Sequence, residues 1–240
     1  MSGFNSYEDA RRATAYSTLE FPGTYYLAYR DLPAIIAEHV RGVRAVDFGC
    51  GAGRSTRFLR RLGFEAEGVD SSAEMIRRAK EIDPAGNYRL IPDDGVLPLD
   101  GEAYDLVLSV FTFDNIPTAE RKVSLFRSFS RLLRDQGRIL SLVSSPDVYR
   151  HEWASFSTKD FPENTVAKTG DVVRCVIKGI GDDRPVEDVL WTDDSYREVY
   201  RDAGLELIRA YRPLGRVGEP TRWVSEARIP PWVIYVLRGA

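Results

Sequence analysis

The sequence has few cysteines and no long apolar run, and both absences limit the kind of protein that it encodes. The two cysteines, Cys50 and Cys175, cannot make a disulfide framework, and neither stands in a metal-ligand spacing. No stretch reaches the roughly 18 apolar residues that a membrane-spanning helix needs, and the polar N-terminal segment lacks the apolar core of a signal peptide. We therefore expect a cytoplasmic protein with no metal ion and no membrane contact.

The sequence also lacks an excess of charge of one sign, an internal repeat and a low-complexity segment. Its 33 basic and 36 acidic residues are mixed along 240 positions and give a formal net charge of -3. No global basic field is present to attract a polyanion, which argues against nucleic acid as a partner. A composition of 43% apolar and 29% charged residues is typical of a folded protein, and we expect a single domain over residues 1–240.

Short apolar stretches alternate with amphipathic ones between residues 43 and 143. Strands are expected at 43–48, 65–70, 88–91, 104–111 and 137–143, and helices at 54–63, 71–82 and 118–137. This alternation predicts an α/β fold, namely a doubly wound, mostly parallel sheet with right-handed crossovers and helices on both faces. Ligands of such sheets bind beyond the carboxyl ends of the strands.

The alternation stops after the fifth strand. Residues 144–190 carry aromatic and polar side chains without a clean period, and we interpret them as a lid or substrate-binding insertion that contains an antiparallel pair at 172–179 and 184–191. In residues 191–240, a capping box of Ser195 and Glu198 predicts the start of a further helix. Residues 205–213 and 231–238 then predict a closing strand pair, antiparallel at the sheet edge.

The stretch VDFGCGAGRST, residues 46–56, places an acid before three glycines at alternate positions. A phosphate loop needs a lysine after the glycines, where this chain has Arg54. A dinucleotide fingerprint needs its third glycine at that same position, and it usually has an apolar residue where this chain has Asp47. Neither of these two loops fits the sequence.

A loop of this kind suits a nonphosphorylated nucleoside that carries an amino-acid group. Gly49, Gly51 and Gly53 allow close approach of a ligand to the backbone, and the free amides at the start of the next helix can bind a carboxylate. Asp47 can meet an ammonium group, directly or through water. Asp70, at the end of the second strand, can accept the hydroxyls of a ribose. Because such an acid also serves dinucleotide sites, an oxidoreductase stays open as a weaker alternative.

Four stretches together resemble the successive motifs of class I S-adenosylmethionine-dependent methyltransferases. They are VDFGCGAGRST, GVDSSAEM, LIPDDGVLPLDGEAYDLVLSVF and LLRDQGRILSLV, and they cover about residues 43–143. The resemblance implies a Rossmann-like methyltransferase fold with a seven-stranded sheet, S-adenosylmethionine as cofactor and S-adenosylhomocysteine as product. It also implies that residues 1–42 cover the cofactor, that 43–143 form the cofactor-binding core and that 191–240 complete it.

The resemblance assigns the cofactor-binding residues position by position. The glycine loop runs under the cofactor, Asp70 binds the ribose, Met75 packs on the adenine, and Phe111 lies near the sulfonium. Met75 also suits a core position, Asp93 and Asp94 also suit a simple turn, and Arg30 also suits a solvated helix surface. The full set is Tyr25, Arg30, Asp47, Gly49, Gly51, Gly53, Asp70, Ser71, Met75, Asp93, Asp94 and Phe111, with Tyr26 as a further candidate.

The methyl acceptor is less well defined. Related enzymes that methylate nucleobase amino groups commonly carry an Asn or Asp, two prolines and an aromatic after the fourth strand, where this chain reads FTFDNIP. We therefore expect a small-molecule acceptor that is methylated on oxygen or nitrogen by a monomer or homodimer. Carbon methylation, and a noncatalytic module that binds the cofactor as a regulator, stay open as alternatives.

Candidate acceptor residues lie after the fourth strand and in the insertion. His151 is the candidate general base, because it stands in an aromatic segment where a substrate would enter. Structural roles are equally open for these positions, in a turn before Pro117 or in a minor core of the insertion. The candidate substrate-binding residues are Asp114, Asn115, Tyr149, Trp153 and Trp223, with Phe156 as a further wall residue.

Overall fold

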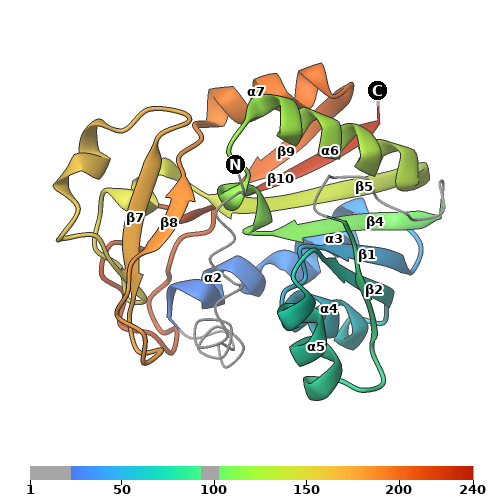
Figure 1. The fold of residues 1–240 in the computed structure, drawn as a ribbon, viewed down its shortest axis with the longest axis horizontal. Coiled ribbons are helices and arrows are strands. Elements are labelled where there is room, and N and C mark those ends of the chain that lie inside the picture. Colours follow the sequence, from blue (N-terminus) through green and yellow to red (C-terminus); the bar gives the residue numbers. More distant parts are fainter. Residues whose placement is uncertain (1–22, 93–102, 240) are drawn as a thin grey trace.

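A seven-stranded sheet forms the centre of the computed structural model, which describes residues 23–92 and 103–239 (Figure 1). Its strand order is β3-β2-β1-β4-β5-β10-β9. The strands are β1 (Arg44–Phe48), β2 (Glu65–Asp70), β3 (Asn87–Leu90), β4 (Tyr104–Val110), β5 (Leu133–Ser144), β9 (Leu205–Tyr211) and β10 (Trp232–Gly239). The order places the ends of β1 and β4 side by side at the centre of the sheet.

Most neighbouring strands run parallel. The pairs β1–β2, β1–β4, β2–β3 and β4–β5 are parallel, whereas β10 is antiparallel to both β5 and β9. The predicted doubly wound, mostly parallel, seven-stranded sheet is therefore confirmed. The closing pair is antiparallel as expected, but β10 lies inside the sheet and β9 forms its edge.

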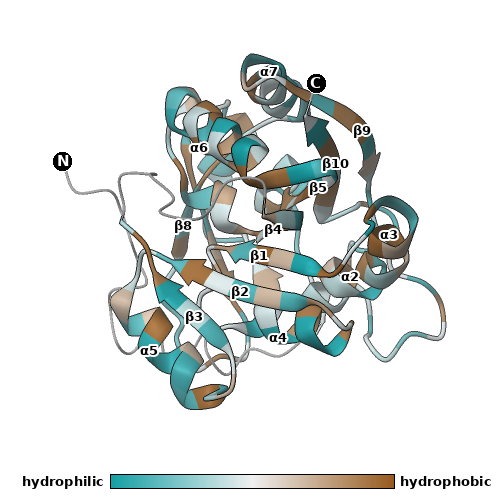
Figure 2. Ribbon diagram, turned by 90° about the vertical axis from the view of Figure 1, so that its right-hand side faces the viewer, coloured by the Kyte–Doolittle hydropathy of each residue, from teal (hydrophilic) through white to brown (hydrophobic). Residues whose placement is uncertain are grey.

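Helices cover both faces of the sheet because the strand residues alternate between two cores. In β10, Ile234 and Val236 belong to one buried cluster, and Val233 and Leu237 belong to the other. The first cluster packs against α2 (Thr24–Arg30), α3 (Leu32–His39) and α4 (Arg54–Arg61), and the second against α6 (Ala119–Leu132) and α7 (Asp193–Asp202). Figure 2 shows these two groups of helices on opposite sides of the sheet. Helix α5 (Ala73–Ile82) follows β2.

The insertion after β5 builds a second, three-stranded sheet beside the first, in the order β6-β7-β8 (Figure 1). Its strands are β6 (Phe156–Ser157), β7 (Val172–Ile177) and β8 (Val186–Val189). The short helix η2 (Pro146–Tyr149) connects β5 to β6, and η3 (Pro162–Val166) connects β6 to β7. The predicted antiparallel pairing of β7 with β8 is confirmed, with Cys175 opposite Val186. The domain boundaries themselves stay a prediction.

Two predicted element ends were wrong. Helix α6 ends at Leu132, and the chain goes directly into β5, where Leu133 pairs with Tyr104 of β4. Leu133 therefore belongs to a strand, and the apolar run that it shares with Leu132 concealed the boundary. Helix α7 is capped by Thr192, whose hydroxyl accepts a hydrogen bond from the Ser195 amide, so Ser195 lies inside the helix and forms no capping box.

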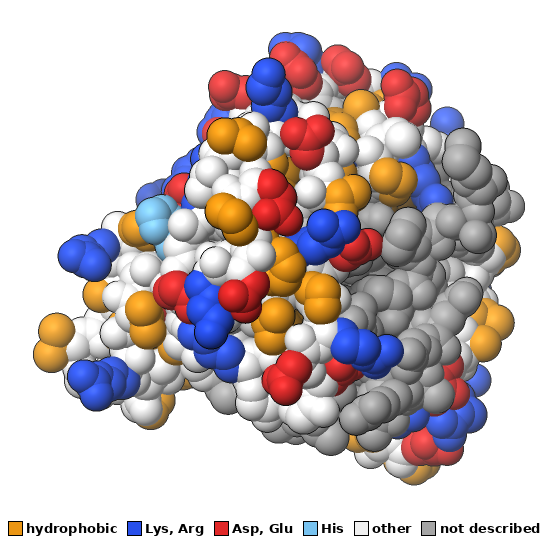
Figure 3. Space-filling model, turned by 60° about the vertical axis from the view of Figure 1, so that its left-hand side comes forward, with side chains coloured by type: hydrophobic (Ala, Val, Ile, Leu, Met, Phe, Trp, Pro, Cys, Tyr) orange, Lys and Arg blue, Asp and Glu red, His pale blue; other side chains and the backbone are white. Residues whose placement is uncertain are grey.

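The described helices include none long and apolar enough to cross a membrane. On the face seen in Figure 3, basic and acidic side chains alternate with apolar ones and do not gather into a patch of one sign. Groups of three or more His, Cys, Asp or Glu side chains that could hold a metal ion are not found within residues 23–92 and 103–239.

Candidate active site

The glycine loop joins β1 to α4 at the carboxyl end of the sheet. Gly49, Gly51 and Gly53 have φ angles of 71°, 52° and 83°, a region that glycine enters without strain. A Cβ atom at Gly49 would overlap the side chain of Thr112, whereas a Cβ atom at Gly51 would have no atom of the described residues within 4 Å. The loop therefore packs closely against the residues after β4, and residues 23–92 and 103–239 leave open space over Gly51.

Asp70 ends β2 and holds the glycine loop in place. Its Oδ2 accepts a hydrogen bond from the Gly51 amide at 2.8 Å, and its Oδ1 accepts one from the Ser72 amide at 2.8 Å. Burial raises the pKa of this carboxyl above its ordinary value. A carboxylate has about four lone-pair positions and the backbone amides do not use all of them, so the position fits a ribose hydroxyl. Ser71 lies in the same turn between β2 and α5.

Asp47 is fully buried beneath the start of α4. The hydroxyls of Ser55 and Thr56 donate to its Oδ2 at 2.7 and 2.6 Å, while its Oδ1 is buried with no hydrogen-bond partner in the described part of the chain. Burial raises the pKa of Asp47 to about 6. An ammonium group beside Oδ1 would supply the missing donor and favour the charged carboxylate, so the site fits the amino-acid end of S-adenosylmethionine.

Met75 and the two acids after the third strand complete the predicted adenine site. Met75 is 5% exposed in the first turn of α5, and its amide donates to the hydroxyl of the helix cap Ser72. Its position is compatible with a role in the core and with a wall for adenine. Asp93 and Asp94 lie outside the described residues.

Phe111 follows β4 and has a backbone conformation that is unusual for a residue with a side chain. Its φ angle is 63°, in the left-handed region, where such strain is typical of functional positions. The ring centroid of Phe111 lies 4.6 Å from that of Trp232 and 5.8 Å from that of Tyr25. Phe111 therefore lies directly after β4, and its place near the sulfonium stays a prediction.

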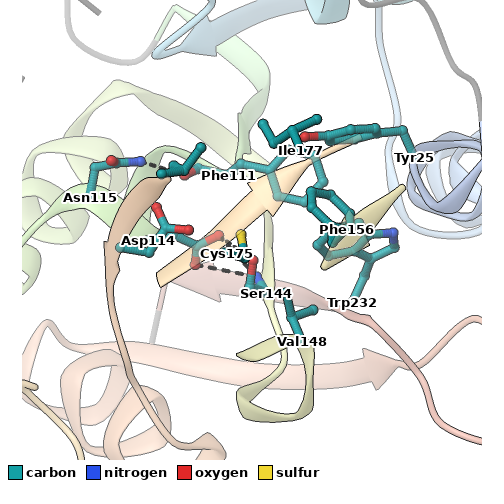
Figure 4. Close-up of a pocket in the computed structure, with 12 residues that line it drawn as sticks. Tyr25, Phe111, Asp114, Asn115, Ser144, Val148, Phe156, Cys175, Ile177 and Trp232 are labelled. Atoms are coloured by element: carbon teal, nitrogen blue, oxygen red, sulfur yellow. Dashed lines mark hydrogen bonds between the residues drawn. The ribbon is translucent and has the colours of Figure 1, made fainter. Parts of the chain in front are cut away.

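A pocket of about 50 Å³ opens beside Phe111. Figure 4 shows aromatic rings gathered at one end of this pocket and the polar side chains of Asp114, Asn115 and Ser144 toward the other. Its lining residues are Tyr25, Phe111, Asp114, Asn115, Ser144, Val148, Phe156, Cys175, Ile177, Val186, Asp188 and Trp232.

Helix α2 connects the pocket to the glycine loop. Tyr25 lines the pocket, and the guanidinium carbon of Arg54, the first residue of α4, lies 5.1 Å from the centroid of its ring. Arg30, on the same helix, forms ion pairs with Asp31 at 2.7 Å and with Glu219 at 2.6 Å. The predicted contact of Arg30 with the cofactor has no support in this geometry and stays a prediction.

The predicted substrate residues divide into two groups. Asp114 and Asn115 line the pocket; the Asp114 carboxylate accepts hydrogen bonds from the Ser144 hydroxyl at 2.8 Å and from the Ser144 amide, and Asn115 Nδ2 donates to the Phe111 carbonyl at 3.4 Å. Tyr149 is buried behind the lining, and its hydroxyl donates to Oδ2 of Asp188 at 3.0 Å. Tyr149 therefore acts on the pocket through Asp188.

Three other predicted residues are not among those that line the pocket. Trp153 is fully buried and donates to the Val148 carbonyl at 2.8 Å, so it belongs to the core of the insertion. Trp223 stacks on Tyr26 with ring centroids 6.5 Å apart. The ring of His151 packs edge-on against that of Trp153. His151 follows the end of η2, and Val148 of that helix lines the pocket whereas His151 is not among the lining residues. A base role for His151 has no support from this geometry.

The sequence analysis missed a buried group of charges next to the pocket. Asp188 lines it from β8, and Lys122 of α6 is fully buried with its Nζ donating to the Phe113 carbonyl. The signal for Asp188 was its spacing in RPVEDVLW, because Val186 and Asp188 are two residues apart on a strand and share a face. Lys122 left no such signal, since a lysine on an amphipathic helix is usually exposed.

The fold and the loop define the class of protein. Residues 46–141 match the model of the family described as "Methyltransferase domain", so the resemblance predicted from the sequence is confirmed for this core. The chain is also similar to the structure of an S-adenosylmethionine-dependent methyltransferase from Clostridium acetobutylicum, with a TM-score of 0.64, 12% identity and coverage of 99% of both chains. The cofactor of this class is S-adenosylmethionine, as predicted.

Individual relatives are similar to the chain over different lengths and at different sequence identities. The malonyl-[acyl-carrier protein] O-methyltransferase of Salmonella typhimurium is 38% identical over 64 residues, which span 27% of this chain and 25% of that relative. The structure of the CcbJ methyltransferase from Streptomyces caelestis matches 92% of this chain and 100% of its own, with a TM-score of 0.64 and 19% identity. These likenesses establish the fold and leave the acceptor open.

Proposed function

We propose that the chain is an enzyme that transfers a methyl group from S-adenosylmethionine to an oxygen or nitrogen of a small-molecule acceptor and releases S-adenosylhomocysteine. The observation that carries this proposal is the position of the pocket at the end of β4, directly beside the glycine loop at the end of β1. Tyr25 lines the pocket and contacts Arg54 at the start of α4, so a ligand on the loop and a ligand in the pocket would share this wall.

In this proposal, one group of residues binds the cofactor and the walls of the pocket bind the acceptor. Asp47 Oδ1 would hold the ammonium group, the space over Gly51 would admit the nucleoside, and Asp70 would hold the ribose. When bound, S-adenosylmethionine supplies a methyl group already activated on a sulfonium, so the protein has mainly to orient the acceptor and exclude water. Good orientation alone contributes roughly 7 to 11 kcal/mol to such a reaction. The aromatic walls of the pocket serve both purposes.

The size of the pocket favours a small acceptor or a short group of a larger one. About 50 Å³ of space holds a few non-hydrogen atoms, and four aromatic side chains leave little room for a polymer. The name of the Salmonella typhimurium relative points to an oxygen acceptor carried on a protein, but the alignment with it covers a quarter of that relative. We therefore keep the small-molecule acceptor as the proposal.

Calorimetry on the full chain tests the proposal first. We expect both S-adenosylmethionine and S-adenosylhomocysteine to bind, and incubation of the donor with a metabolite extract to release S-adenosylhomocysteine. Absence of binding by either compound would refute the proposal. Tight binding without release in any extract would favour a noncatalytic regulatory module instead, and product analysis would separate carbon from oxygen and nitrogen methylation.

A further inference from the structure

Two carboxylates open into a pocket that is also lined by four aromatic side chains. Asp114 enters from η1 (Thr112–Asn115), the short helix after β4, and Asp188 enters from β8 of the insertion. Opposite them, the ring centroids of Phe111 and Trp232 lie 4.6 Å apart, and that of Phe156 lies 5.7 Å from Trp232. Aromatic faces together with carboxylates form the environment that binds organic cations.

The two carboxylates differ in how far they are available to a ligand. Asp114 is 4% exposed, and its carboxylate already accepts hydrogen bonds from the amide and hydroxyl of Ser144. Asp188 is partly exposed, its Oδ2 accepts from Tyr149, and no described residue donates to its Oδ1. Oδ1 of Asp188 is therefore the acceptor that a ligand in the pocket can reach.

The buried charged groups next to the pocket would be balanced by one further cation. Lys122 is the cation that interacts with both acids, and its Nζ is held by the Phe113 carbonyl and lies 4.6 Å from the ring centroid of Trp191. When both acids are ionised, their two negative charges face at most the one positive charge of Lys122. Because buried charges need partners, a ligand cation would complete the balance, whereas a carboxylate ligand would add repulsion.

We propose that the methyl acceptor is an amine, which enters the pocket as an ammonium ion, binds Oδ1 of Asp188 against the aromatic walls, and gives its proton to that carboxylate before it is methylated. This inference rests on the proposed function and names its substrate class. Asp188 is then a catalytic residue, and Tyr149 is a positioning residue that acts through Asp188.

The step is balanced in atoms and charge. One N–H bond of the ammonium breaks, its proton goes to Asp188 Oδ1, and the nitrogen keeps the electron pair. That pair forms the new N–C bond to the methyl group as the S–C bond breaks, and sulfur keeps the electrons of the broken bond. The products are a methylated ammonium ion, S-adenosylhomocysteine and a protonated Asp188, which then returns its proton to water.

The acid–base properties of Asp188 suit this role. Burial first, and then the nearby Asp114 carboxylate, raise the pKa of Asp188 to about 8, so it is a stronger base than an exposed carboxylate. Its charge interactions reach residues of several packed elements, namely Asp114, Lys122, Tyr149, Cys175 and Tyr196. Burial lowers the pKa of Lys122 to about 7 and raises that of Asp114 to about 6.

All three shifts predict the same pH dependence of cation binding. Asp114 and Asp188 become negative, and Lys122 becomes neutral, as the pH rises from 6 to 8. Because an aliphatic ammonium stays charged over this range, its affinity should rise with pH, by at least about tenfold. A ligand without charge should show no such dependence.

Three small probes that share a tert-butyl group test the inference. The full chain is saturated with S-adenosylhomocysteine, and tert-butylamine, tert-butanol and pivalate are titrated while NMR follows binding. We expect tert-butylammonium to bind at least about tenfold more tightly than tert-butanol, and pivalate to bind most weakly. Equal affinity for the ammonium and the alcohol, or no binding of the ammonium, would overturn the amine inference.

Matched variants connect the result to Asp188. Asp188→Asn keeps the acceptor for the Tyr149 hydroxyl, and we expect it to abolish the preference for the ammonium and to weaken its pH dependence to the part that Asp114 and Lys122 contribute. Glu187→Gln is the control, because Glu187 is next to it in β8 and pairs with Arg174 at 2.8 Å instead of lining the pocket. Tyr149→Phe removes a donor to Asp188 and should move the pH profile upward. If Asp188→Asn and Glu187→Gln behaved alike, Asp188 would not be the site.

The same samples separate this inference from the proposed function. Failure of S-adenosylmethionine and S-adenosylhomocysteine to bind the wild-type chain would overturn the proposed function. If both bind and the three tert-butyl probes show no preference for the cation, only the amine inference fails.

Discussion

At the scale of single residues, the sequence analysis named Asp47 and Asp70 for the cofactor and Asp114 for the acceptor, and it missed Asp188 of the pocket. Asp47 and Asp70 adjoin the glycine loop or end the next strand, so their roles follow from local order along the chain. Asp188 reaches the pocket because β8 packs beside η1, a contact between segments about 70 positions apart. The strand spacing puts Asp188 on the same face as Val186, but it does not show that this face meets η1.

Replacing Asp70 with alanine tests the cofactor site. The change removes the acceptor of the Gly51 and Ser72 amides together with the proposed ribose ligand. Two hydrogen bonds from the ribose hydroxyls to this charged group would contribute about 3 kcal/mol or more to the binding free energy. We therefore expect S-adenosylhomocysteine to bind the variant roughly a hundredfold more weakly by calorimetry.

The control for this change is Glu65→Ala, at the exposed start of the same strand. It should bind S-adenosylhomocysteine like the wild type. Unchanged affinity in the Asp70→Ala protein, with its fold intact by circular dichroism, would rule out the ribose assignment.

At the scale of elements, local signals located most strands and helices but placed some ends wrongly. The loop between β1 and α4 follows from three glycines whose φ angles are all positive. The end of α6 does not follow from local signals, because Leu132 and Leu133 are both apolar and only the pairing with β4 assigns Leu133 to β5. The insertion had no clean period, since its sheet is short and its core is aromatic.

Alanine substitutions at three glycines distinguish the effect of backbone strain from the effect of filling the space that the cofactor would occupy. Gly51 and Gly170 both have positive φ angles, and no atom from the described part of the chain lies within 4 Å of a Cβ atom built at either, so each substitution should cost about 1 to 2 kcal/mol of unfolding free energy. Only Gly51→Ala should also lower the affinity for S-adenosylhomocysteine, because its methyl group would occupy the space over the loop. Gly49→Ala should destabilise more than either, since its methyl group would overlap Thr112.

Chemical denaturation and calorimetry on the three proteins measure these effects. Gly170→Ala is the control, because it carries the same kind of strain in the loop before β7. If Gly51→Ala and Gly170→Ala retained the same cofactor affinity, the cofactor would not approach the backbone at Gly51.

At the scale of the whole molecule, the sheet was predictable and the acceptor pocket was not. Alternating strands and helices define a doubly wound sheet whatever its ligand, and the structure has that sheet. The pocket is assembled from α2, the end of β4, the end of β5, the insertion and the start of β10. Since segments that extend from Tyr25 to Trp232 must meet to form it, its charge and size become visible only in the folded chain.

The transfer of an isotopically labelled methyl group tests the central claim most directly. The full chain is incubated with S-adenosylmethionine that carries a deuterated methyl group and with a panel of small amines, alcohols and carboxylic acids, and mass spectrometry follows both products. We predict that S-adenosylhomocysteine forms in equal amount with a deuteromethylated amine, and that Asp70→Ala and Asp188→Asn strongly reduce both. Label found only on alcohols or acids would contradict the amine inference, and a cofactor that binds without losing its label to any compound would contradict the account as a whole.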